Sequence, residues 1–380
     1  MTNGQSTLTA ADPFVGRTLD EKYIVEERLG AGGMGAVYRA RHLSMDRPVA
    51  IKFLHQRFVE DEAARSRFQT EARAAVKLRH ANAVSVTDFG QTAEGCIYIV
   101  MELLEGRTLR ETLSREAPLE TARAISLMLQ TSAAVAAAHE AGIIHRDLKP
   151  SNILVTQSAD QPAVVKVLDF GIATFTPDDD DEVITTLNHT NPVIGTPRYM
   201  SPEQYNGNEL TPATDVYSLG VILYEMLAGM APFTGSTPAE IAGKHANDQP
   251  HAPREIVAAI PEDIEGIVLK ALEKQPADRF ANAAEFHEEL LATAERLGLE
   301  HHALKSSPDI EALREAGVES PSGRLVVDIS RLREKRALSS GSNEIKVLGE
   351  NSPKPPPVED KPVEPSSFLD KVKRILGLHD

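Results

Sequence analysis

The chain has 380 residues, of which 41% are hydrophobic, so it is too long for one ordinary domain and can bury a sizeable core. Its net charge of −16 lies entirely in residues 1–295, because residues 296–380 hold 14 basic and 14 acidic residues. Such an acidic body repels nucleic acid and anionic membrane surfaces, and we expect no nucleic acid as a partner. The single cysteine, Cys96, excludes an intrachain disulfide and suits a reducing compartment.

The first residues, MTNGQSTLTAADPF, lack the basic region and apolar run of a signal peptide. Two apolar stretches, 124–144 and 216–233, contain polar or charged residues that interrupt them. Neither offers the roughly 18 uninterrupted apolar residues of a membrane span, so we expect both to be buried helices. These features predict a cytoplasmic protein with no transmembrane segment.

The first half of the chain carries mainly strand patterns. After a polar lead-in at 1–20, apolar and polar residues alternate in KYIVEERLG, AVYRARHL and RPVAIKFL, which predicts a β-meander between Tyr23 and Leu54. Residues 61–79 have apolar positions at helical spacing, and CIYIVMELLEG predicts a further strand that runs into a connector.

From about residue 107 long helical patterns dominate. We expect helices at 107–115, 119–141, 214–229, 238–247, 262–273 and 281–297, with short strands only at NILVT and VVKVLDFG. The fold class is therefore α+β, with a small β-rich lobe at about 21–105 and a larger, mainly helical lobe at about 106–297.

The end of the chain differs in composition from both lobes. Ser, Pro and charged residues dominate 298–365, which predicts a flexible tail, and residues 366–380 have the apolar spacing of a short amphipathic helix. This helix could dock on a partner protein or on the domain, contact a membrane weakly, or fray. We expect this helix to dock, either on a partner protein or on the domain itself.

The segment LGAGGMGAVYRA contains G-x-G-x-x-G, a spacing shared by dinucleotide-binding units and by the phosphate loop of protein kinases. A dinucleotide-binding unit needs a helix after the third glycine and an acidic residue about 20 positions later. Here AVYRARHL is strand-like, and at about that distance stands Lys52 in VAIK. The dinucleotide interpretation therefore fails. Protein kinases have the arrangement seen here, in which two strands joined by a turn are followed by a lysine on the third strand.

Three further motifs follow in order: HRDLKPSN at 145–152, DFG at 169–171 and GTPRYMSPE at 195–203. Over about 20–295 the chain resembles the bacterial branch of the Hanks-type serine/threonine protein kinases. The resemblance implies a bilobal kinase domain at 21–297 that uses ATP and Mg²⁺, with Mn²⁺ possible, to phosphorylate Ser and Thr hydroxyls of proteins.

The resemblance also implies roles for single residues. Asp147 would orient the substrate hydroxyl and accept its proton, and Lys149 would be directed at the γ-phosphate. Lys52 would hold the α and β phosphates and pair with Glu71. Asn152 and Asp169 would supply oxygen ligands to Mg²⁺. The expected nucleotide contacts are Leu29, Gly30, Ala31, Gly32, Gly33, Met34, Gly35, Ala36, Val37, Ala50, Lys52, Met101, Glu102, Leu104 and Leu154.

The expected structural residues are Glu203, paired with Arg279, and Asp215, which would anchor the catalytic loop from a buried helix. In the family an arginine such as Arg146 receives a phosphate on the activation segment. The candidate regulatory threonines are Thr185, Thr186 and Thr190, while Thr196 would contact the catalytic residues. Autophosphorylation would involve a transient homodimer.

Two alternatives to an active protein kinase stay open. A pseudokinase scaffold could bind nucleotide and act through its tail, but Lys52, Asp147, Asn152 and Asp169 are all present. A small-molecule kinase on the same fold is a lesser alternative, because the segment GTPRYMSPE is the usual platform for peptide docking.

Overall fold

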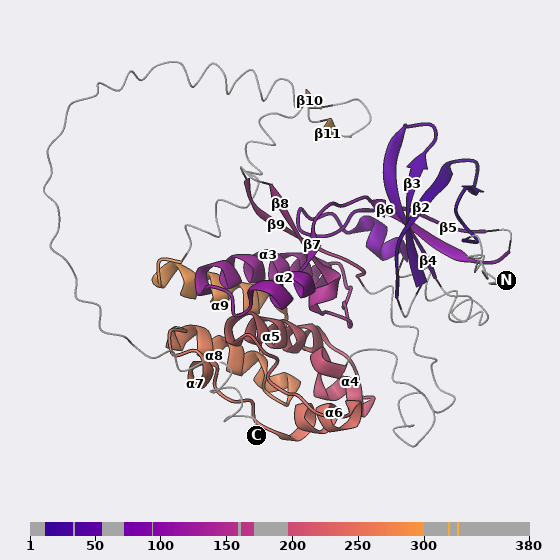
Figure 1. Cartoon of the computed structure of the whole chain (residues 1–380). Coiled ribbons are helices and arrows are strands. Elements are labelled where there is room, and N and C mark those ends of the chain that lie inside the picture. Colours follow the sequence, from indigo (N-terminus) through magenta and orange to yellow (C-terminus); the bar gives the residue numbers. More distant parts are fainter. Residues whose placement is uncertain are drawn as a thin grey trace, which may run out of the picture. The chain divides into compact units, whose positions relative to one another are not determined.

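The structure, a computed structural model, describes residues 12–32, 35–54, 72–92, 94–158, 161–170 and 197–299, and two short strands at 318–319 and 325–326. The chain divides into two compact units, Met1–Ser306 and Ser307–Asp380. The first unit contains a β-rich lobe followed by a mainly helical lobe (Figure 1). In the second unit β10 (Val318–Glu319) pairs antiparallel with β11 (Leu325–Val326).

The β-rich lobe is built on an antiparallel sheet with the strand order β1-β2-β3-β4-β6-β5. Its strands are β1 (Thr18–Leu19), β2 (Tyr23–Gly32), β3 (Gly35–His42), β4 (Arg47–Leu54), β5 (Val86–Gln91) and β6 (Ile97–Glu102). The predicted meander is β2 to β4, and the predicted strand at CIYIVMELLEG is β6. Strand β3 pairs with β2 on one side and with β4 on the other, so Gly35 at the start of β3 lies opposite Leu54 at the end of β4.

The two faces of this sheet carry separate apolar clusters, because side chains alternate along each strand. On β4, Ile51 and Phe53 belong to one cluster. Ala50 and Leu54 belong to the other, which also includes Ala72 from the helical residues 72–77. Lys52 lies between Ala50 and Leu54 in the strand and therefore shares the face that turns toward this helix.

Residues 12–20, which the sequence analysis placed in a lead-in, pack on the opposite face of the sheet. The Phe14 ring stacks on Phe53 with centroids 3.9 Å apart. The Tyr38 hydroxyl donates a hydrogen bond to Asp12 (3.0 Å), and β1 extends the sheet beside β2. This segment is thus part of the lobe.

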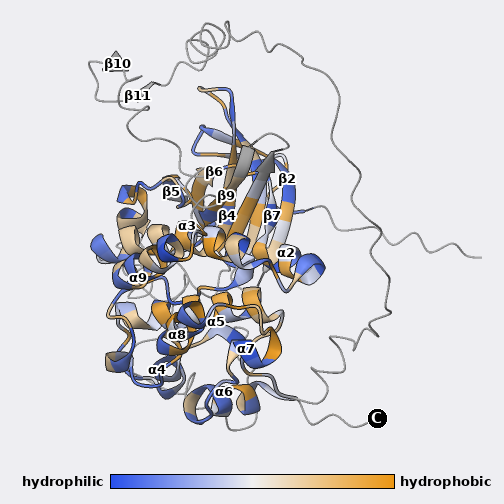
Figure 2. Cartoon of the chain, turned by 90° about the vertical axis from the view of Figure 1, so that its left-hand side faces the viewer, coloured by the Kyte–Doolittle hydropathy of each residue, from blue (hydrophilic) through white to orange (hydrophobic). Residues whose placement is uncertain are grey.

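The helical lobe is centred on α5 (Pro212–Ala228), in which every residue from Ala213 to Ala228 is buried. The helix ends where Gly229 adopts a left-handed conformation (φ 78°). The helices around it carry both hydrophilic and hydrophobic residues, as expected of helices that bury one side only (Figure 2). They are α2 (Leu109–Glu116), α3 (Thr121–Glu140), α4 (Pro202–Asn206), α6 (Pro238–Asn247), α7 (Pro253–Ile256), α8 (Glu262–Ala271) and α9 (Ala283–Arg296).

The helix expected to start at 107 begins two residues later. Arg107 and Thr108 form β7, which pairs with β8 (Ile153–Ser158), and β9 (Gln161–Val167) completes this small sheet. Thr108 then caps α2, because its side chain accepts from the N–H of Glu111 and the Glu111 carboxylate accepts from the N–H of Thr108. The strand pairing with residue 155 is long-range, so helical periodicity alone could not show it.

Within the described residues, no helix combines the length and the apolar character needed to cross a bilayer. The stretches 124–144 and 216–233 are largely α3 and α5, and both are core helices. The amphipathic segment at 366–380 lies outside the described residues.

Candidate active site

Lys52 and Asp169 meet between the two lobes. Nζ of Lys52 lies 2.8 Å from Oδ2 of Asp169, and the lysine side chain is only 8% exposed. Burial acts to raise the pKa of the Asp169 carboxyl, but the Lys52 ammonium outweighs it and holds this pKa below its ordinary value. Asp169 has φ 58°, a conformation that a non-glycine residue adopts only where its surroundings compensate the strain.

Asp147 lies within hydrogen-bonding distance of two other candidate residues. Lys149 donates from Nζ to both carboxylate oxygens of Asp147 (3.0 and 2.7 Å). Nδ2 of Asn152 donates to the backbone carbonyl of Asp147 (2.9 Å) and to its Oδ2 (3.2 Å). The Asp147 carboxylate is therefore held in place by groups from its own loop.

Leu168 stands between β9 and Asp169, and its backbone groups bind the catalytic loop. Its N–H donates to the carbonyl of Asn152 (2.8 Å), and its carbonyl lies 2.8 Å from Nε2 of His145. Because a carbonyl only accepts, Nε2 of His145 carries the proton, which leaves Nδ1 to accept from the N–H of Asp147 (3.3 Å). One rigid unit thus positions Asp147, Asn152 and Asp169.

Asp215, fully buried on α5, supports this loop from below. Its carboxylate accepts hydrogen bonds from the N–H groups of His145 (2.7 Å) and Arg146 (2.8 Å). His139, at the end of α3, lies 2.8 Å away through Nε2. The contact with the catalytic loop is the one expected for Asp215, whereas His139 was not singled out in the sequence because its partner is 76 residues away.

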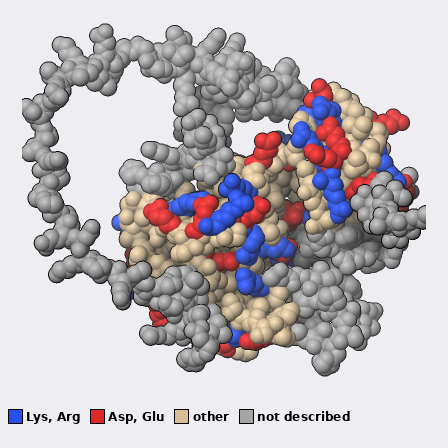
Figure 3. All heavy atoms as spheres, viewed as in Figure 1, with Lys and Arg blue, Asp and Glu red and all other residues tan. Residues whose placement is uncertain are grey.

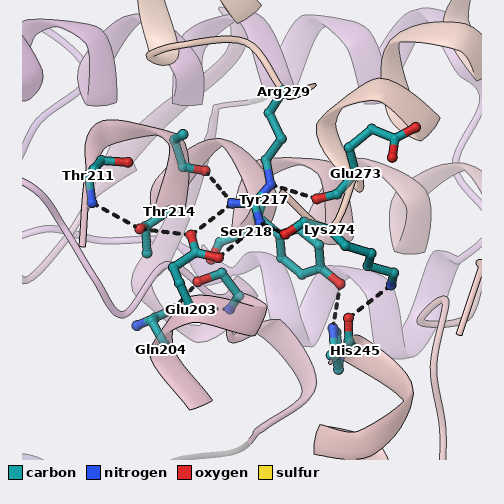
Figure 4. A network of polar contacts seen from close by, with 12 residues as sticks. Glu203, Gln204, Thr211, Thr214, Tyr217, Ser218, His245, Glu273, Lys274 and Arg279 are labelled. Atoms are coloured by element: carbon teal, nitrogen blue, oxygen red, sulfur yellow. Dashed lines mark hydrogen bonds and ion pairs between the residues drawn. The ribbon is translucent and has the colours of Figure 1, made fainter. Parts of the chain in front are cut away.

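Glu203 and Arg279 form a buried bidentate ion pair, with Nη1–Oε1 and Nη2–Oε2 distances of 2.8 and 2.9 Å (Figure 4). Burial alone would raise the pKa of Glu203. The hydrogen bonds and charge of Arg279 outweigh this effect, so the pKa of Glu203 lies below its ordinary value. Thr214 also donates to the carboxylate (3.0 Å), and the guanidinium lies over the Tyr217 ring. The pair joins the start of α4 to the segment before α9.

The glycine segment forms the expected strand–turn–strand. Gly30 pairs with Val37, and Gly32 pairs with Gly35. A Cβ on Gly35 would lie 1.8 Å from the carbonyl oxygen of Phe53, so only glycine fits there, whereas a Cβ on Gly30 would meet open space. Gly33 and Met34 lie outside the described residues.

The sheet face that carries Lys52 also carries apolar side chains. Ala50 and Met101 belong to one cluster, and Val37 and Leu104 pack against it. Leu154 is buried on β8, whereas Leu29 is half exposed. The N–H of Glu102 donates to the carbonyl of Ser85 (3.0 Å), so this N–H is not available to adenine.

The residues present fit a divalent cation that also binds phosphate. Nδ2 of Asn152 is used by Asp147, which leaves Oδ1 for a ligand, and Asp169 binds Lys52 through Oδ2. An amide oxygen and a carboxylate oxygen are the donors that Mg²⁺ prefers. The described residues contain no group of three or more Asp, Glu, His or Cys side chains suited to a metal.

Several candidate residues lie outside the described part of the chain. They are Glu71, Thr185, Thr186, Thr190 and Thr196. Arg146 is described: it has φ 64°, and its carbonyl accepts from Nε2 of Gln204 (2.7 Å). Gln204, on α4, was not singled out in the sequence, and its bond ties α4 to the catalytic loop.

The family model described as protein kinase domain matches residues 23–291. The chain belongs to the protein kinase family. Among curated proteins it is 46% identical over 283 residues to the serine/threonine-protein kinase pkn3 of Myxococcus xanthus, a match that covers 74% of this chain and 51% of that protein. It is 40% identical to PknB of Mycobacterium tuberculosis (72% and 43% covered) and 34% identical to PrkC of Bacillus subtilis (86% and 50% covered).

Among solved structures, the kinase domain of Mycobacterium tuberculosis PknI matches with a TM-score of 0.58 and 26% identity, covering 73% of this chain and 98% of that one. The predicted bilobal kinase fold and membership in the bacterial serine/threonine kinases are thus confirmed. The chain spans about half the length of pkn3 and PrkC and 43% of the length of PknB.

Proposed function

We propose that this protein is an active protein kinase that transfers the γ-phosphoryl group of ATP to Ser and Thr hydroxyls of proteins. The observation that carries the proposal is the convergence of Lys149 and Asn152 on Asp147, in a loop that Leu168 ties to Asp169. Phosphoryl transfer depends mainly on positioning and on neutralising negative charge, and this arrangement provides both.

Each of these residues has a chemical role in the proposal. The Asp147 carboxylate accepts the proton of the substrate hydroxyl, and Lys149 offsets charge on the transferred phosphoryl group. Asn152 and Asp169 would hold Mg²⁺, or Mn²⁺ in its place, which neutralises phosphate charge when bound. Lys52, buried beside Asp169, would bind the α and β phosphates of ATP.

Regulation by autophosphorylation is part of the proposal. A phosphate on Thr190, or on Thr185 or Thr186, would be received by Arg146, whose backbone N–H and carbonyl bind Asp215 and Gln204. A transient homodimer would transfer it. A tail-docked partner and a cytoplasmic location stay predictions from the sequence.

The proposal is tested with the purified full-length chain, radiolabelled ATP, a mixed protein acceptor, and Mg²⁺, Mn²⁺ or a chelator. We expect label on phosphoserine and phosphothreonine with either metal and none with the chelator. Nucleotide binding without any transfer would instead indicate a pseudokinase scaffold, and label on small molecules alone would indicate a small-molecule kinase.

A further inference from the structure

A cluster outside the catalytic residues surrounds Glu225, a nearly fully buried carboxylate on α5 that phosphoryl transfer does not use. The Tyr199 hydroxyl donates to its Oε2 (2.5 Å), and Nη1 of Arg110 donates to its Oε1 (3.1 Å). Burial and Glu225 raise the pKa of Tyr199, so the phenol stays protonated and remains a donor. Both carboxylate oxygens therefore have partners, as a buried carboxylate requires.

A second arginine, Arg198, lies near the same carboxylate, whose negative charge is already balanced by Arg110. Nη1 of Arg198 lies 3.9 Å from Oε1 of Glu225, beyond hydrogen-bonding distance, and its side chain is 34% exposed. Arg110 is 39% exposed as well. Two guanidinium groups thus share one carboxylate, and the cluster has a net positive charge with donors open to solvent.

Acidic residues on the neighbouring helix α2 do not cancel this charge. Glu111 binds the N–H and hydroxyl of Thr108, and Glu116 pairs with Arg123. Figure 3 shows basic atoms in the middle of this face of the molecule, with acidic atoms interspersed among them. Among the described residues, these carboxylates of α2 thus leave the cluster's positive charge in place, and both guanidinium side chains are partly exposed.

The cluster lies beside the catalytic loop. Helix α2, which carries Arg110, packs against Pro150–Asn152, directly after Lys149. Arg198 and Tyr199 belong to the turn Pro197–Tyr199, whose chain continues to Gln204 and its bond with the carbonyl of Arg146. A peptide whose hydroxyl reaches Asp147 must pass close to these two elements.

We propose that Arg198, together with Arg110, selects protein substrates that carry an aspartate or glutamate a few residues from the phosphorylated Ser or Thr. This inference rests on the proposed kinase activity and names its substrate class. Guanidinium groups bind carboxylates in planar, two-pronged geometry, and a like-charged lysine in the peptide would be repelled. Arg198 is the specificity residue, because Arg110 is already committed to Glu225.

The test uses the full-length chain and peptides with one threonine acceptor, in which Asp, Ala or Lys is placed in turn at each of the positions −4 to +4. We expect at least one position where the Asp peptide has a kcat/KM about 10-fold above that of the Ala peptide, equivalent to ~1.4 kcal/mol. The difference should lie in the peptide KM and should shrink at high salt, because the attraction is screened.

Arg198→Gln should abolish this preference at that position without changing the KM for ATP. Arg115→Gln, which removes an exposed charge elsewhere on α2, should keep it. If the Ala peptides are phosphorylated and no Asp peptide has a higher kcat/KM, this inference is wrong but the proposed kinase activity stands. The same holds if the preference for Asp survives Arg198→Gln or high salt. A chain that labels no peptide and no protein would contradict the proposed activity instead.

Discussion

Nζ of Lys52 on β4 lies 2.8 Å from Oδ2 of Asp169, which follows β9, so a buried ion pair joins the β-rich lobe to the helical lobe. Both residues come from motifs more than 100 positions apart in the sequence. With the ties that Leu168 makes to His145 and Asn152, the pair fixes where phosphates and a metal ion would lie relative to Asp147.

Lys52→Met should remove the cation that holds Asp169 and that we assign to the phosphates. We expect kcat/KM for ATP-dependent phosphorylation to fall at least about 100-fold, the usual effect of removing one preorganised charge donor. Lys77→Met, an exposed lysine on the helix at 72–77, serves as the matched control and should keep wild-type rates. Equal rates for both variants would refute the role of Lys52.

Asp215→Asn should lower kcat while leaving nucleotide affinity nearly unchanged. The N–H groups of His145 and Arg146 donate to different oxygens of the native carboxylate, so the asparagine amide would turn its NH2 donor toward one of them. Misplacement of the catalytic loop by such a clash costs about 100-fold. Steady-state kinetics with titrated ATP separates the two effects, and a rise in KM alone would contradict the anchoring role.

Glu203→Gln should destabilise the helical lobe by about 3–5 kcal/mol, because it leaves Arg279 buried without its charge partner. Urea unfolding at pH 7 measures this. Glu209→Gln, at an exposed position in the loop after α4, should change the free energy of unfolding by less than about 0.5 kcal/mol.

The same ion pair predicts a pH dependence. Because the pKa of Glu203 is lowered on folding from an ordinary value of 4.5, its stabilisation is complete above that value and is lost as the pH falls through the folded pKa. The wild-type protein should therefore lose more stability than Glu203→Gln between pH 5 and acid pH. Parallel pH profiles of the two proteins would show that Glu203 is not the responsible group.

Two glycine substitutions should differ in stability although both lie in one motif. Gly35→Ala forces a Cβ into the carbonyl of Phe53 and should lower the melting temperature by several degrees, since a backbone shift costs roughly 1–3 kcal/mol. Gly30→Ala meets open space and should melt like wild type. If Gly30→Ala melted at a lower temperature than Gly35→Ala, the backbone around these two glycines would have to be arranged differently.

Much of the site could be predicted because its residues stand at fixed short offsets: Asp147, Lys149 and Asn152 fall within one loop of the sequence. Periodicity also located α3, α5 and α9 to within a few residues. Long-range partners could not be predicted. The stacking of Phe14 on Phe53 leaves no pattern in a single sequence, because it depends on how separate elements pack.

The central claim is tested most directly by Asp147→Asn in a radiolabelled ATP assay, with Asp278→Asn as an exposed control. Asp147→Asn keeps the shape of the side chain but loses the carboxylate that accepts the hydroxyl proton. We predict that phosphate transfer falls at least about 100-fold while nucleotide binding and the melting temperature stay at wild-type values. Undiminished transfer by Asp147→Asn would contradict the claim that this site catalyses phosphorylation.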